Sequence, residues 1–223
     1  SRTALGRVVR LATCNLNQWA LDFDGNLRRV MESIRQAKAQ NAVYRIGPEL
    51  ELCGYGCEDH FLEIDTVRHC WESLATLLAS DVTEHCLCDI GMPIVHKGVR
   101  YNCRVVCLDH QVLMIRPKMY LANDGNYRER RYFASYEWSS SDPNPMETFT
   151  LPQVVADLPQ GQTTTHFGVG ILKFLDATVT CEMCEELFVA NSPHIALALN
   201  GAEIIGNGSG SHHQLRKLNV RVE

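Results

Sequence analysis

The feature that most limits the possible folds of this chain is a set of short apolar runs without a polar face, separated by segments of helical periodicity. Strands that are apolar on both faces must be covered on both faces, as they are in layered α/β proteins. A half-exposed meander would instead alternate polar and apolar residues. The chain is therefore predicted to form a layered α/β core.

The order of the segments predicts alternating strands and helices. Apolar residues recur at helical spacing in residues 26–40, and further helices are expected at 66–78 and 193–199. Strands are expected at residues 8–14, 42–46, 86–92, 102–108, 112–116, 171–175, 177–180 and 202–205. The fourth and fifth of these strands should form a hairpin. Residues 124–145 have no clear period, so we expect a long loop there, and loops of that length are usually functional.

The composition disfavours several classes of protein. A net charge of −5 argues against a nucleic-acid partner, which normally selects a basic face. No apolar run approaches the roughly 20 residues that a membrane helix requires, and residues 1–7 are basic without the apolar stretch of a secretion signal. No linker or repeat divides the chain, so residues 1–223 are expected to form one domain. The missing initiating Met is compatible with a piece of a longer protein.

The ten cysteines do not predict a disulfide scaffold. Most lie in apolar runs, where reduced cysteine behaves as a small hydrophobic residue, and a chain of this length can bury a core without cross-links. Reduced thiols and a cytoplasmic location are expected. Cys181 and Cys184 have the spacing of a redox or zinc pair, but a structural zinc site needs a second pair of ligands and no matching Cys-x-x-Cys occurs. No metal site is expected.

Three apolar runs end in residues that together supply a base, a cation and a thiol, namely Glu49, Lys118 and Cys184. A thiol needs a base to become a good nucleophile, and the acyl intermediate needs positive charge or N–H groups around its oxyanion. The chain is therefore predicted to be a cysteine amidohydrolase. On spacing alone, Glu49 and Lys118 are equally compatible with solvated residues that follow strands, and Cys184 with a buried thiol.

Longer motifs around these residues carry a family resemblance. They are Asn-Gln-Trp-Ala-Leu-Asp-Phe at 17–23, Gly-Tyr-Gly-Cys-Glu-Asp-His-Phe at 54–61 and Ala-Asn-Asp-Gly-Asn-Tyr-Arg-Glu at 122–129, with further similarity at 101–103 and 210–213. From about residue 8 to residue 222 the chain resembles the N-terminal glutaminase domain of eukaryotic glutamine-dependent NAD+ synthetases, which are members of the nitrilase superfamily. The resemblance implies a four-layer α-β-β-α sandwich. Nitrilase domains usually continue with further strands, so a sandwich truncated at its C-terminal end is an open expectation.

The resemblance also assigns roles to residues. It implies Glu49 as base, Lys118 as oxyanion cation, Glu129 as the carboxylate that steadies the lysine, and Cys184 rather than Cys181 as nucleophile, at a strand-to-helix turn where a helix N-terminus favours the thiolate. It implies pocket positions at Tyr55, Tyr127, Glu185, Phe188, Ser209 and Ser211. Glu185 is the candidate for the substrate ammonium, and the two serines are candidates for contacts near the substrate carboxylate, with Arg216 as a weaker one.

By the resemblance, the domain hydrolyses L-glutamine and needs no cofactor of its own. The ammonia passes to a synthetase domain that uses ATP, Mg and deamido-NAD+, and a homo-oligomer is expected. The Ser-Gly-Gly-x-Asp-Ser phosphate loop of that synthetase domain does not occur in these residues. Gly208 stands where the family more often has Ala or Ser, so we expect a looser turn there. Two alternatives stay open: a free-standing amidase for another small amide, and a non-catalytic fragment.

Overall fold

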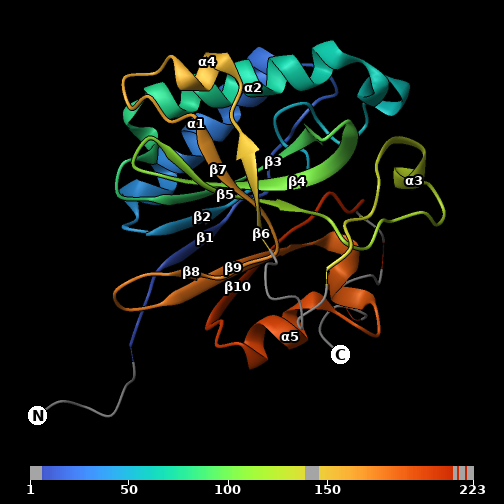
Figure 1. Cartoon of the computed structure of the whole chain (residues 1–223). Helices are drawn as coiled ribbons and strands as arrows, with labels where there is room; N and C mark the ends of the chain where they lie inside the picture. Colours follow the sequence, from blue (N-terminus) through green and yellow to red (C-terminus); the bar gives the residue numbers. More distant parts are fainter. Residues whose placement is uncertain (1–6, 139–145, 213–214, 216–218, 220–223) are drawn as a thin grey trace, which may run out of the picture.

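The computed structural model describes residues 7–138, 146–212, 215 and 219, and these residues form two β-sheets with helices on their outer faces (Figure 1). The larger sheet has seven strands in the order β1-β2-β3-β4-β5-β7-β6, and the smaller has three in the order β10-β9-β8. The bounds of the large sheet are β1 Leu11–Thr13, β2 Tyr44–Ile46, β3 Leu87–His96, β4 Val99–Leu108, β5 Gln111–Pro117, β6 Met146–Thr150 and β7 Thr164–Gly168. The small sheet consists of β8 Leu172–Lys173, β9 Thr178–Met183 and β10 Ile204–Gly208.

The helices complete four layers. Helices α1 (Phe23–Ala39), α2 (Ile64–Ala79) and α4 (Gln153–Ala156) cover the outer face of the large sheet, and α5 (Pro193–Leu199) covers the small sheet from the opposite side (Figure 1). Shorter helices lie in the connections, namely α3 Glu129–Tyr132 and the 3-10 helices η1 Glu58–Leu62, η2 Asp81–Thr83 and η3 Cys184–Phe188. The α-β-β-α sandwich expected from the resemblance is confirmed.

Two apolar clusters hold the layers together. Val30 and Ile34 of α1, together with Leu74 and Leu78 of α2, are almost fully buried against the large sheet. The second cluster lies between the two sheets and contains Tyr44, Ile46, Leu87, Val106, Met114, Val179 and Cys181. Because β2, β3, β4 and β5 are buried on both faces, they read as continuous apolar runs in the sequence.

Strand pairing explains which elements the sequence predicted. The expected hairpin is present as the antiparallel pair β4–β5. Strand β9 begins within one residue of its expected start and extends to Met183, beyond its expected end at residue 180. Strand β6 at the edge of the sheet and its neighbour β7 were missed because exposed residues interrupt the buried ones in both strands and no apolar run forms. The segment expected as a loop contains α3, and residues 139–145 lie outside the described residues.

All ten cysteines are free, and all except Cys14 are buried. Within the described ranges we find no group of three or more His, Cys, Asp or Glu side chains that could hold a metal ion. None of the described helices is long and apolar enough to cross a membrane.

Candidate active site

The fold brings together a lysine and two carboxylates from three separate connections. Glu49 lies in the turn that follows β2, Lys118 directly follows β5, and Glu129 opens α3. The Lys118 Nζ lies 2.6 Å from Glu49 Oε1 and 2.9 Å from Glu129 Oε1. All three side chains are buried, so the alternative in which Glu49 and Lys118 are solvated residues is wrong.

Two further groups hold the Glu49 carboxylate. The Asn102 Nδ2, from the middle of the large sheet, donates to Glu49 Oε1 at 2.7 Å and to Glu129 Oε1 at 3.3 Å. The backbone N–H of Gly210 donates to Glu49 Oε2 at 3.2 Å. Sequence reasoning assigned no role to Asn102, although a carboxamide at the start of a predicted apolar strand was an available signal.

Burial and the paired charges set the protonation of this cluster. Burial alone would raise the pKa of Glu49, but the Lys118 charge and the hydrogen bonds it accepts hold that pKa below its ordinary value. Burial, followed by the charge of Glu49, raises the pKa of Glu129 to about 7. Burial opposes the charged form of Lys118, yet the two carboxylates raise its pKa above the ordinary range. At neutral pH, Glu49 is therefore an ionised acceptor beside a lysine that stays cationic.

Cys184 lies at a sharp turn between β9 and η3. Its φ of 38° is in the left-handed region, which costs a non-glycine residue free energy and is typical of strained functional turns. Helix η3 is a five-residue 3-10 helix and not an α-helix. The α-helical N-terminus that was expected to stabilise the thiolate is therefore absent at Cys184. Cys181 lies within β9 and belongs to the core between the sheets, as expected.

Two serine hydroxyls lie against the Cys184 sulfur. The Ser209 Oγ donates to Cys184 Sγ at 3.3 Å, and the Ser211 Oγ lies 3.5 Å from the same sulfur. Burial and the Glu49 charge raise the pKa of the Cys184 thiol, and Lys118 with the two hydroxyls offsets this only in part. The resting sulfur is therefore a thiol that needs a base. Since the Gly210 N–H donates to Glu49, the segment 209–211 connects the Glu49 carboxylate to the Cys184 sulfur.

Two tyrosines line the same region. The Tyr55 hydroxyl donates to Glu129 Oε1 at 2.7 Å. Its ring packs so closely on Gly210 that a Cβ there would lie 2.5 Å from Tyr55 Cδ2, which explains why this position requires glycine. Tyr127 meets Tyr55 edge to face at 6.0 Å, and its hydroxyl accepts from the backbone N–H of His212 at 3.2 Å. Both tyrosines are thus placed beside the lysine and its carboxylates.

The remaining predicted pocket residues are less enclosed. Glu185 is half-buried, and Phe188 is 44% exposed at the end of η3. Arg216 lies outside the described residues. The neighbouring Glu186 is instead completely buried, which the sequence analysis did not anticipate. An acidic residue between the nucleophile and the apolar pair Leu187 and Phe188 was the available signal.

The expectation that Gly208 loosens a turn is wrong. Gly208 lies within β10, paired in register with Met183 of β9. A Cβ at this position would lie 2.4 Å from the guanidinium of Arg104, which is itself completely buried. The glycine therefore allows Arg104 to pass between the two sheets.

A separate groove of about 1130 Å³ lies between the opposite ends of the two sheets. Its walls include Val8, Val43, Leu87 and Val179, and its rim includes Arg10. The groove contains none of the residues that surround Cys184, so we assign the chemistry to the enclosed cluster and not to this larger hollow.

Comparison with known proteins places the chain in a family of known chemistry. Residues 10–220 match the model of the family described as carbon-nitrogen hydrolase. A glutamine-dependent NAD(+) synthetase from Dictyostelium discoideum is 55% identical over 218 residues, which are 97% of this chain and 30% of that protein. The chain thus spans about 30% of the length of the curated relatives it matches.

Solved structures share the same fold. A glutamine-dependent NAD(+) synthetase from Cytophaga hutchinsonii matches with a TM-score of 0.79 at 26% identity, over 96% of this chain and 32% of that one. A mutant amidase of the nitrilase superfamily from Nesterenkonia AN1 matches with a TM-score of 0.68 at 16% identity, over 94% of this chain and 68% of that one. At that identity the second match supports the fold alone.

Proposed function

We propose that this chain, which belongs to the carbon-nitrogen hydrolase family, is the glutaminase part of a glutamine-dependent NAD+ synthetase. One observation carries the proposal: the segment 209–211 touches both the Glu49 carboxylate, through the Gly210 N–H, and the Cys184 sulfur, through two serine hydroxyls. A base with a low pKa and a thiol with a high one therefore share one small enclosure with a lysine cation. These are the requirements of amide hydrolysis through a thioester.

In the first half of the reaction, Glu49 accepts the proton of the Cys184 thiol. The sulfur then attacks the side-chain carbonyl carbon of glutamine, and the carbonyl oxygen becomes an oxyanion. Lys118 has three N–H donors, of which two are used by the carboxylates of Glu49 and Glu129, so one remains for that oxygen. The N–H of Glu185, which follows the nucleophile, is the second donor we propose.

In the second half, the protonated Glu49 gives its proton to the leaving nitrogen, and the C–N bond breaks to release ammonia. Glu49, ionised again, takes a proton from water while the water oxygen attacks the thioester carbon. Glutamate leaves, and the proton returns to the sulfur. Glu129 holds Lys118 in place throughout, because its carboxylate also accepts from the Ala122 N–H at 2.7 Å and from Tyr55.

Substrate choice is proposed to lie at the rim of this enclosure. Glu185 is the candidate partner of the substrate ammonium, while Ser209 and Ser211 supply polar contacts near its carboxylate. Tyr55, Tyr127 and Phe188 would form the walls of the pocket. Arg216 remains a proposal that rests on sequence alone.

The wider setting is also a proposal. The domain comprises residues 1–223 and needs no cofactor, while ATP, Mg and deamido-NAD+ serve a synthetase domain that receives the ammonia. The ten free thiols support a cytoplasmic location, because such thiols persist in reducing compartments. A homo-oligomer is supported by the family resemblance.

The direct test is to incubate the purified chain with L-glutamine and to measure ammonia and glutamate. Cys184→Ala should lower turnover by about 10⁴-fold or more, because it removes the nucleophile. Cys181→Ala, in the strand β9 that directly precedes Cys184, is the matched control, and it should keep turnover within about threefold while it costs about 1–2 kcal/mol of stability. Equal activity of wild type and Cys184→Ala would refute the assignment. Faster hydrolysis of acetamide than of glutamine would favour a free-standing amidase.

A further inference from the structure

The carboxylate of Glu186, two residues after Cys184, joins the end of β5 to the end of β9 through three hydrogen bonds. Its Oε1 accepts from the backbone N–H of Met119 at 2.6 Å and from Arg116 Nη1 at 2.6 Å. Its Oε2 accepts from the backbone N–H of Met183 at 2.6 Å. Each of these partners is adjacent to a residue of the proposed reaction or two residues from it, since Met119 follows Lys118 and Met183 precedes Cys184.

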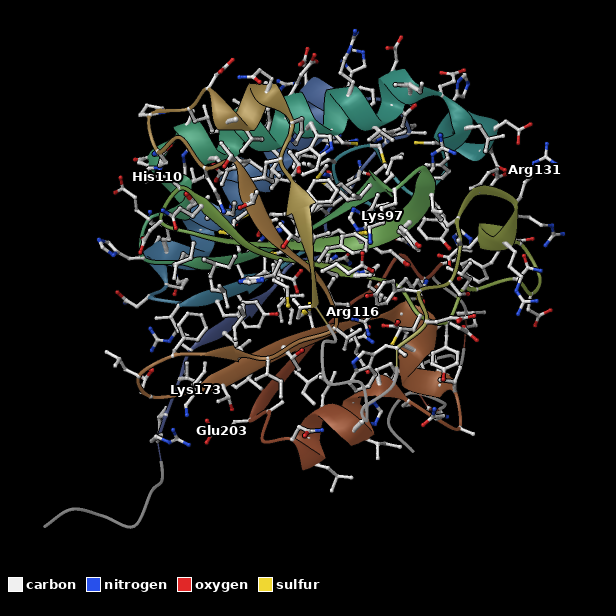
Figure 2. The ribbon with its side chains drawn as sticks, viewed as in Figure 1. Lys97, His110, Arg116, Arg131, Lys173 and Glu203 are labelled. Carbon is white, nitrogen blue, oxygen red and sulfur yellow. The ribbon has the colours of Figure 1, made fainter. Side chains whose placement is uncertain are left out.

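The contacts of Glu186 lie in the interior of the protein, away from solvent. Glu186 and Arg116 are both completely buried, and Figure 2 shows Arg116 in the interior, between the large and the small sheet. The Nε and Nη2 atoms of Arg116 have no hydrogen-bond partner in the described part of the chain. An ion pair with unmet donors is a weak source of stability, because desolvation of the two charges offsets their attraction. The geometry around Glu186 therefore points to a role beyond stabilising the fold.

We propose that Glu186 is a positioning residue that fixes the Lys118 turn of the large sheet against the Cys184 turn of the small sheet. The inference rests on the proposed function, because it treats Lys118 and Cys184 as reacting partners. The two turns belong to different sheets, and the contacts of Glu186 are short and direct. A displacement of about 1 Å between reacting groups can cost about 100-fold in rate.

The chemistry of the three partners requires a carboxylate. Met119 N–H, Met183 N–H and Arg116 Nη1 are all donors, and an ionised carboxylate offers only acceptors. In Glu186→Gln, the new NH₂ group would face at least one of these donors, and the contact between the two turns would open. In Arg116→Met the ion pair is lost, but both backbone N–H groups keep their acceptors. The two variants thus separate the positioning of the turns from the charge pair.

The test measures two quantities on the whole chain. The first is the pH midpoint of Cys184 alkylation by iodoacetamide, followed by mass spectrometry of the Cys184 peptide. The second is the kcat and KM for L-glutamine. In Glu186→Gln the midpoint should rise by about half a pH unit or more, because the thiolate loses the Lys118 cation. The kcat should fall by about 100-fold with KM within about threefold.

Arg116→Met and Glu186→Asp are the control variants. Arg116→Met should keep the midpoint within about 0.3 pH units and kcat within about fivefold, even though its melting temperature falls as in Glu186→Gln. Equal changes of midpoint and kcat in the two variants, or a wild-type midpoint in Glu186→Gln, would overturn the proposal. If Glu186→Gln does not fold, Glu186→Asp replaces it, with a smaller shift in the same direction expected and no shift refuting the idea. The alkylation needs no glutamine, so a wild type without glutaminase activity would refute the proposed function and leave this test intact.

Discussion

The two sides of the enclosure are built in different ways. On the large-sheet side, every carboxylate oxygen of Glu49 and Glu129 accepts a hydrogen bond, and the Lys118 ammonium lies between the two groups. The turn that carries Glu49 is anchored further by Arg104, which donates to the carbonyls of Gly47 and Pro48 at 3.0 and 2.8 Å. The proposed base Glu49 and the Lys118 cation are thus held by buried charges that belong to the fold.

The small-sheet side is held more locally. Cys184 follows a three-stranded sheet, adopts a strained φ, and directs its sulfur to two serine hydroxyls at 3.3 and 3.5 Å. The chain then leaves the interior at Phe188. The difference teaches that buried ion pairs hold the proposed acid–base groups, whereas serine hydroxyls contact the buried Cys184 sulfur and the proposed pocket wall at Phe188 is partly exposed. Substitutions of Glu49, Lys118 or Glu129 should therefore change stability and rate together, whereas substitutions at the exposed pocket wall of the small-sheet side should change rate or KM alone.

The largest expected effect comes from Lys118→Met. The variant leaves two carboxylates in one buried site without a cation, and removal of one partner from a buried pair costs about 3–5 kcal/mol. Loss of the oxyanion donor should lower kcat by about 10³-fold. Urea unfolding and ammonia release measure the two effects. The control is Lys97→Met, which breaks an exposed pair with Glu147 and should cost less than about 1 kcal/mol. A stable Lys118→Met variant would show that the large-sheet side is not part of the structural core.

Glu129→Gln should remove a pH dependence of stability. Because the folded pKa of Glu129 is raised from 4.5 to about 7, the group favours folding below pH 4.5 and this contribution is lost as the pH rises through 7. At about 1.4 kcal/mol per pH unit, the loss is on the order of 3 kcal/mol. The pKa of Glu49 is lowered, so this group makes the free energy of unfolding rise with pH, but only below about pH 4.5. The free energy of unfolding of the wild type should therefore fall relative to the variant between pH 4.5 and 8, and parallel curves would contradict this reading.

The smallest effect is expected from Phe188→Ala on the small-sheet side. The side chain is 44% exposed, so its loss should change stability by no more than about 0.5 kcal/mol. If it lines the pocket, KM for glutamine should rise by about three- to tenfold with kcat nearly unchanged. Steady-state kinetics and thermal melting measure both. A marked loss of stability would show that the two sides of the enclosure do not differ as described.

The sequence predicted some strands and some candidate site residues and missed others, and the differences have physical reasons. Strands buried on both faces, such as β4 and β5, were found because their whole surface is apolar. The edge strand β6 and its neighbour β7 were missed because partial exposure removes that signal. Glu49, Lys118 and Cys184 were singled out because each ends an apolar run, and their catalytic roles stay predictions.

Asn102 and Glu186 were missed because their roles depend on distant partners. Asn102 contacts carboxylates 53 and 27 positions away, and Glu186 contacts Arg116 70 positions away. A polar residue beside an apolar run marks each position in the sequence, but it does not identify partners that are so far away along the chain. The roles of Glu185, Ser209 and the other proposed pocket residues stay predictions.

The most direct test of the account is covalent labelling of the purified chain with a diazoketone analogue of glutamine, followed by intact mass and peptide mapping. We predict a single adduct on Cys184, slowed by L-glutamine, because the charges of Glu49 and Lys118 both act on this thiol and two serine hydroxyls contact it. No adduct, or label spread over several of the ten cysteines, would contradict a formed glutamine pocket around an activated Cys184.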